Sequence, residues 1–242
     1  MDVLGLLERQ TSVWGLSLDS HRLARLEAFA RLLSDYEEAN VIGTRTMRGV
    51  LLDHILDSLS CFLFHPLGDA RRLVDVGSGG GLPGIPIKIV APELEAMLVE
   101  STAKKAHFLR RAVETLSLER ATVANARVEQ IARMEAYRGA YDIATARAVA
   151  RLSVVAEYCV PLLKVGGYVI SMKGRPDDGE ISEGERAAEK LGARVATLIR
   201  VSRLPELEEK ERCLVIFEKV EETPGEYPRN VGVPAKKPLG VV

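Results

Sequence analysis

The chain has 242 residues, 47% of them hydrophobic, and its formal net charge is −1 at pH 7. This length is enough for one large domain with a substantial core, or for a domain with an appendage. The near-zero charge excludes a globally basic nucleic-acid-binding protein, although it is compatible with a local basic patch. The chain has no run of about eighteen apolar residues, so we expect no membrane-spanning helix.

The amino terminus and the cysteines indicate a cytoplasmic protein. Residues Met1 to Leu4 hold no basic segment ahead of an apolar stretch, which argues against a secretory signal. Cys61, Cys159 and Cys213 are far apart and have apolar neighbours, so we expect buried free thiols in a reducing compartment. The histidines and cysteines have no metal-ligand spacing, so we expect no metal site.

Residues 1–70 are expected to form a helical extension. Apolar residues recur there at helical spacing in two groups, Leu23, Leu26, Phe29, Ala30 and Leu33, and then Val50, Leu51, Ile55, Leu59 and Phe62. The segment Thr44–Thr46 lies between the groups as a helix start. Amphipathic helices need a partner surface, so we expect the extension to pack on the edge of the main domain.

Residues 71–220 alternate between strand and helix patterns. We expect strands near 72–77, 96–100, 121–125, 141–146 and 165–172, and helices near 84–91, 103–117, 127–135, 150–163 and 181–192. This alternation predicts a parallel sheet covered on both faces. Two further strands, near 195–201 and 212–217, lack an intervening helix, which predicts a closing antiparallel hairpin. The expected α/β fold is therefore a mostly parallel, seven-stranded, Rossmann-like sheet of the methyltransferase arrangement, and a second dinucleotide-binding half is disfavoured.

Residues 221–242 form a tail rich in proline and glycine. It contains Arg229, Lys236 and Lys237, with no acidic residue after Glu226. This composition is typical of a disordered terminus. The alternative is an arm that becomes ordered on RNA, for which Tyr227 would supply a ring for stacking.

The most informative stretch is Leu73–Gly84, an apolar strand that breaks into glycines just before a helix. Glycine allows a tight turn and the close approach of a ligand, and the helix directs free N–H groups into that turn. Asp75 lies two residues before Gly77. There its carboxylate would repel a pyrophosphate and attract the ammonium group of a methionine-like ligand. The pattern resembles the cofactor loop of methyltransferases that use S-adenosylmethionine.

The same glycines leave a second cofactor class open. Gly79, Gly81 and Gly84 also match the G-x-G-x-x-G fingerprint of dinucleotide-binding proteins. Glu100 ends the next apolar strand, where an acid can accept hydrogen bonds from ribose hydroxyls of either cofactor. The first alternative function is therefore that of a dinucleotide-dependent oxidoreductase. The second alternative is a non-catalytic RNA-binding protein with a methyltransferase-like fold.

Several further segments carry a specific resemblance. They are His54–Ser58, Asp75–Pro86, Lys104–Leu109, Ala126–Glu129, Ala146–Ala150, Met172–Gly174 and Tyr227–Leu239. With them the chain resembles, over nearly its whole length, the GidB/RsmG family, bacterial methyltransferases that make 7-methylguanosine in small-subunit (16S) ribosomal RNA. The Leu-Pro-Gly-Ile-Pro loop with a downstream Ala-Arg-Ala makes the match specific. Many members have Asp where this chain has Glu100, and either acid can hold a ribose.

The resemblance implies S-adenosylmethionine as the cofactor and assigns residues to it. Gly77, Gly79 and Leu82 would line the cofactor loop, Glu100, Ser101 and Thr102 would meet the ribose and neighbouring groups, Val128 and Glu129 would lie beside the adenine, and Arg147 would be a further cofactor contact. No catalytic residue is assigned. Guanine N7 carries a lone pair and no proton, so the transfer requires alignment and no general base.

The implied partner is small-subunit ribosomal RNA or an assembling ribosomal subunit, bound by a monomer. Lys173 and Arg175 follow the fifth strand toward the ligand-binding edge, so we expect them to contact RNA phosphates. A second basic cluster contains Lys104, Lys105, Arg110 and Arg111, and solvated helix charges are the simpler interpretation for Arg110 and Arg111.

Overall fold

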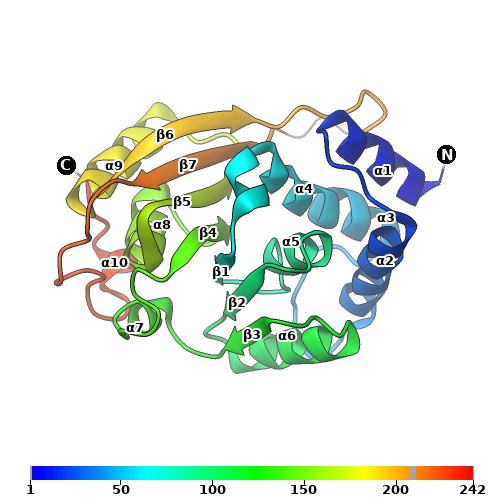
Figure 1. The fold of residues 1–242 in the computed structure, drawn as a ribbon, viewed down its shortest axis with the longest axis horizontal. Helices are drawn as coiled ribbons and strands as arrows, with labels where there is room; N and C mark the ends of the chain where they lie inside the picture. The colour runs from blue at the N-terminus through cyan, green and yellow to red at the C-terminus, as the bar shows by residue number, and fades with distance from the viewer. Residues whose placement is uncertain (1, 208–210, 242) are drawn as a thin grey trace.

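A computed structural model of the chain describes residues 2–207 and 211–241 (Figure 1). Its centre is a seven-stranded sheet in the order β3-β2-β1-β4-β5-β7-β6. The strands are β1 Arg72–Val76, β2 Glu95–Val99, β3 Ala121–Ala124, β4 Tyr141–Arg147, β5 Leu163–Lys173, β6 Ala193–Arg200 and β7 Cys213–Lys219. Strands β1 to β5 run parallel, and β7 runs antiparallel to both β5 and β6. The predicted fold class and its terminal hairpin are confirmed.

Both faces of the sheet are buried, because successive residues of a strand point to opposite faces. In β1, Leu73 packs in a cluster with α5 (Gly84–Val90), whereas Val74 and Val76 pack in a cluster with α8 (Leu152–Cys159). Figure 1 shows α1 to α6 on one side of the sheet and α7 to α10 on the other.

The other helices of this region are α6 (Ala103–Thr115), α7 (Val128–Ile131) and α9 (Asp178–Lys190). The predicted helix over 127–135 is wrong in length, because α7 is only four residues long. Beyond it the chain tightens into short turns, and the carbonyl oxygen of Ala132 accepts a hydrogen bond from the Arg138 guanidinium in place of a helical N–H.

The amino-terminal residues are helical, as expected. The elements are α1 Val3–Val13, α2 Ser20–Asp35, α3 Met47–Gly49, a π-helical turn η1 Val50–Ile55, α4 Leu56–Leu59, and the 3-10 segments η2 Ser60–Leu63 and η3 His65–Asp69. Leu26 and Phe29 of α2 share one buried cluster with Ile85 of α5 and Phe108 of α6. The extension thus packs against the helices on one sheet face, and the division of the chain at residues 70 and 220 stays a prediction.

The prediction of a disordered terminus is wrong for residues 221–241. This tail is docked on the α8 side of the sheet and contains the short helix α10 (Val233–Lys236). Leu239 is buried there, and the Arg229 guanidinium lies 2.6 Å from the buried carboxylate of Glu157. Its order requires no RNA, because these contacts lie within the chain.

The three cysteines are buried and free, as predicted. Burial raises the pKa of the Cys61 and Cys159 thiols. Among the described residues, no helix combines the length and the apolar character needed to cross a membrane. The same part of the chain contains no group of three or more His, Cys, Asp or Glu side chains suited to a metal ion.

Candidate functional site

The loop after β1 is held against the end of β2. The N–H groups of Gly77 and Ser78 both donate to the carbonyl oxygen of Val99, at 2.9 and 3.0 Å. Gly77 (φ +69°) and Gly79 (φ +55°) lie in the left-handed region, which glycine adopts without strain. A Cβ atom at Gly79 would meet only the carbonyl oxygen of Gly77, at 3.8 Å, so the backbone of Gly79 borders open space.

Asp75 does not face this open side, so the expectation that its carboxylate attracts a ligand ammonium is wrong. The side chain is fully buried. Its Oδ1 accepts a hydrogen bond from the Thr145 hydroxyl at 2.8 Å, and its Oδ2 accepts one from the Gly84 N–H at 3.3 Å. Burial raises the pKa of Asp75 to about 6, against the opposing effect of the hydrogen bonds from Thr145 and Ser78. Asp75 therefore ties β1 to β4 and to the start of α5.

Glu100 lies directly after β2 and is 6% exposed. Its Oε2 accepts a hydrogen bond from the Gly79 N–H at 2.9 Å, and its Oε1 accepts one from the Thr102 N–H at 2.7 Å. Ser101 and Thr102 are exposed beside it. A carboxylate has about four acceptor positions. Glu100 can therefore accept further hydrogen bonds, such as those of two ribose hydroxyls.

Asn125, which follows β3, is a site residue that sequence analysis missed. Its Nδ2 donates to the carbonyl oxygen of Glu100 at 2.9 Å and so supports the turn that carries this acid. The available signal was an amide side chain directly after a strand, at the sheet edge where open α/β sheets bind ligands.

Val128 and Glu129 begin α7, in the loop next to that of Glu100. Glu129 is 2% exposed, and its Oε1 accepts a hydrogen bond from the Gly232 N–H of the tail at 2.8 Å. Burial raises the pKa of Tyr158 to about 12, and the nearby carboxylate of Glu129 adds to this shift. The loops after β1, β2 and β3 thus place all the predicted cofactor residues except Arg147 along one edge.

Arg147 ends β4, and its guanidinium turns toward the amino-terminal helices. Its Nη2 lies 3.3 Å from the Asp57 carboxylate and 2.8 Å from Nδ1 of His54. The other Asp57 oxygen lies 3.3 Å from Nε of Arg212. Burial raises the pKa of Asp57, although both guanidinium groups oppose the shift. These contacts join β4 to the amino-terminal helices, and a contact of Arg147 with a cofactor stays a prediction.

The two residues that follow Arg147, Ala148 and Val149, have features that sequence analysis did not identify. Ala148 has a φ of +54°, a conformation that costs a residue with a Cβ atom strain energy. Val149 follows, and a Cβ atom at Gly77 would lie 2.9 Å from its side chain. Composition carries no signal for the positive φ, because alanine is not a residue that favours it.

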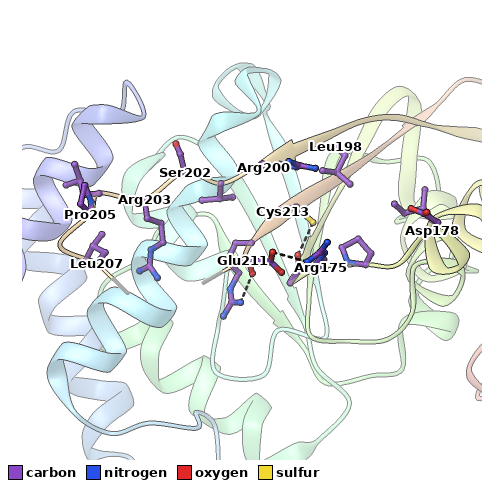
Figure 2. Close-up of a pocket in the computed structure, with 16 residues that line it drawn as sticks. Arg175, Asp178, Leu198, Arg200, Ser202, Arg203, Pro205, Leu207, Glu211 and Cys213 are labelled. Carbon is purple, nitrogen blue, oxygen red and sulfur yellow. Dashed lines mark hydrogen bonds and ion pairs between the residues drawn. The ribbon is translucent and has the colours of Figure 1, made fainter. Parts of the chain in front are cut away.

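The two predicted RNA contacts have different environments. Nζ of Lys173 lies 2.6 Å from Glu180, and the side chain is 20% exposed. Arg175 is 80% exposed and lies 3.3 Å from Glu211. Arg175 also lines a cavity of about 800 Å³ beyond the carboxyl ends of β5 and β6, together with Arg200, Arg203 and Arg212 (Figure 2). Contact of Lys173 and Arg175 with RNA stays a prediction.

Residues 22–211 match the family model GidB, described as rRNA small subunit methyltransferase G. The chain belongs to this family. Ribosomal RNA small subunit methyltransferase G of Rubrobacter xylanophilus is 58% identical over 232 residues, which cover 96% of this chain and 89% of that protein. The protein of the same name from Roseiflexus sp. (strain RS-1) is 41% identical over 238 residues, covering 98% of this chain and 100% of that protein.

A solved structure shows the same fold at low sequence identity. It is a mutein of the branched-chain polyamine synthase from Thermus thermophilus, in complex with N4-aminopropylspermidine and 5'-methylthioadenosine. Its TM-score is 0.59 at 14% identity, and the alignment covers 82% of this chain and 64% of that chain.

The GidB model includes the glycine loop, Glu100, Glu129, Arg147 and Arg175, and it ends before β7. The tail that donates a hydrogen bond to Glu129 therefore lies outside the residues that match this model.

Proposed function

We propose that this chain transfers the methyl group of S-adenosylmethionine to N7 of a guanosine in small-subunit ribosomal RNA. Membership in the GidB family supports methyl transfer, and the names of the relatives support ribosomal RNA as the substrate. The observation that carries the cofactor assignment is the Glu100 carboxylate, which hydrogen bonds hold beside the open backbone of Gly79.

The residues around the loop after β1 fit this cofactor. The loop with Gly77, Gly79 and Leu82 would approach it through backbone atoms, and Glu100 would accept hydrogen bonds from its ribose hydroxyls. Ser101 and Thr102 offer exposed polar atoms beside that acid, and Val128 offers a largely apolar surface for the adenine. When bound, S-adenosylmethionine supplies a methyl group activated by a cationic sulfonium.

The chain has little further chemistry to perform. Guanine N7 has a free lone pair and no proton to lose, so the residues must align the nucleophile and exclude competing orientations. This requirement agrees with a site built from glycine backbone and one fixed carboxylate, and it is the reason that we assign no general base.

The sheet disfavours a dinucleotide-dependent oxidoreductase. A dinucleotide-binding fold places a second mononucleotide-binding half with parallel strands beside the first. Here β7 runs antiparallel between β5 and β6, so the second half has a different topology.

We place the RNA along the cavity beyond β5 and β6. Arg175 reaches it from the end of β5, and Arg200 reaches it from the end of β6 (Figure 2). Arg200 is exposed, and its side chain has no hydrogen bond or ion pair with any other described residue. Lys173 is tied to Glu180, so phosphates would meet Arg175 and Arg200 first. We propose that a cytoplasmic monomer binds either the RNA or the assembling subunit in this way.

Two measurements test the proposal. Equilibrium binding of S-adenosylhomocysteine and of NADH to the purified protein identifies the cofactor class, and we expect binding of the former alone. Mapping of 7-methylguanosine in small-subunit ribosomal RNA, from cells with and without the gene, identifies the reaction. RNA binding without any gene-dependent methylation would support the non-catalytic alternative.

A further inference from the structure

We propose that the tail, residues 221–241, is a positioning element of the cofactor pocket, and that tail docking and cofactor binding stabilise each other. The coupling runs through Gly232, whose N–H holds the carboxylate of Glu129. This inference rests on the proposed use of S-adenosylmethionine.

The first step is the position of Glu129 in the sheet. Val99 at the end of β2 pairs with Ala124 at the end of β3, and adjacent strands lie about 4.8 Å apart. The loop after β3 is therefore within reach of the base of a nucleoside whose ribose lies at Glu100. Val128 and Glu129 begin the helix at that point.

The second step is that the carboxylate of Glu129 needs donors, because it is almost fully buried. The tail supplies one of them from a residue 103 positions away, in a hydrogen bond of 2.8 Å. Hydrogen bonds to an ionised group are among the stronger ones in proteins. The docked tail therefore helps to fix the orientation of the Glu129 side chain, together with the Tyr158 hydroxyl.

The third step is the attachment of the tail. Arg229 binds Glu157, which is completely buried, through its guanidinium at 2.6 and 2.9 Å and through its own backbone N–H at 2.8 Å. The same guanidinium donates to the carbonyl oxygen of Lys237 at 2.7 Å and so closes the segment that carries Gly232. Glu157 adjoins Tyr158, whose hydroxyl interacts with the Glu129 carboxylate, so this attachment and the pocket share one helix.

The experiment measures the affinity of the full-length protein for S-adenosylhomocysteine. Arg229→Ala should weaken binding at least fivefold, within the usual range of coupling between sites. Lys236→Ala is the matched control, because it removes a tail cation whose side chain has no hydrogen bond or ion pair among the described residues, and its affinity should equal that of the wild type.

A double variant distinguishes an effect of the tail on Glu129 from a general destabilisation of the fold. In a Glu129→Ala background, Arg229→Ala should change the affinity by less than twofold, because the tail would have no carboxylate left to hold. If the two substitutions reduced the affinity independently, so that the factors of the single variants multiplied in the double variant, the inference would be overturned.

Hydrogen exchange of the wild type tests whether cofactor binding stabilises the docked tail, and it needs no variant. Reciprocity requires that S-adenosylhomocysteine slow amide exchange in the segment containing Gly232. A wild type that binds S-adenosylhomocysteine with unchanged exchange in this segment would overturn the inference and leave the proposed function intact. A wild type that does not bind it at all would overturn the proposed function itself.

Discussion

Gly79→Ala tests whether the loop after β1 approaches a cofactor. Gly79 has a φ of +55°, and a Cβ atom there would meet nothing nearer than the Gly77 carbonyl oxygen at 3.8 Å. The substitution thus adds backbone strain without a clash inside the protein. The strain amounts to about 1–2 kcal/mol, which for a chain of this size lowers the melting temperature by roughly 2–8 °C.

Gly79→Ala should weaken the binding of S-adenosylhomocysteine by more than its backbone strain alone would predict. The added methyl group points into the space that the ligand would occupy, and overpacking of such a contact costs about 1–3 kcal/mol. Affinity for S-adenosylhomocysteine should therefore fall about 5- to 150-fold, since each 1.4 kcal/mol corresponds to about a factor of ten.

Gly15→Ala provides the matched control. Gly15 has a φ of +79°, and its Cβ atom would meet nothing within 4 Å, so the strain is of the same kind at a position far from the loop. Titration calorimetry and thermal unfolding of both variants give the two quantities. Equal affinities of the two variants for S-adenosylhomocysteine would refute the placement of the cofactor at Gly79.

Three further predictions follow from buried or exposed charges. Because folding raises the pKa of Asp75 to about 6, the free energy of unfolding of the wild type should fall as the pH rises from about 4 to 6, by up to roughly 3 kcal/mol. Chemical denaturation of Asp75→Asn should lack this component of the pH dependence. Arg147→Ala should destabilise the fold by about 3 kcal/mol, because Asp57 loses a buried partner, and a loss below 1 kcal/mol would contradict that role. Replacing Arg175 and Arg200 together by alanine should reduce the salt slope of RNA binding by about two, with unchanged affinity for S-adenosylhomocysteine.

Much of the sheet and of its ligand-binding edge could be predicted from the sequence. Strand and helix periods are local properties, so the alternation from β1 to α8 was visible in the order of the residues. The position of Glu100 could also be predicted, because the carboxyl ends of neighbouring parallel strands meet at one edge. The glycines of the loop were informative because Gly77 and Gly79 require positive φ.

The direction of a side chain at a strand end was harder to predict. Its place near the glycines suggests that Asp75 belongs to the loop, but β1 continues to Val76, so the pleat of the strand decides the direction of the side chain. It shares the face of Leu73, and it accepts hydrogen bonds from Thr145 of β4 and from Gly84 at the start of α5. An acid one residue before the end of a strand is therefore still a residue of the sheet.

The tail shows why composition alone was a poor guide. A segment rich in proline and glycine has few apolar residues with which to form its own core, and so its composition resembles that of disordered chains. Its order arises instead from charges on the main domain. Helix α8 carries one charged residue, Glu157, among neighbours that are nearly all buried. A buried carboxylate must find a cation or other donors, and Arg229 of the tail supplies both a guanidinium and a backbone N–H. The signal for a docked tail was therefore in the sequence of α8, 72 residues away from the arginine that it binds.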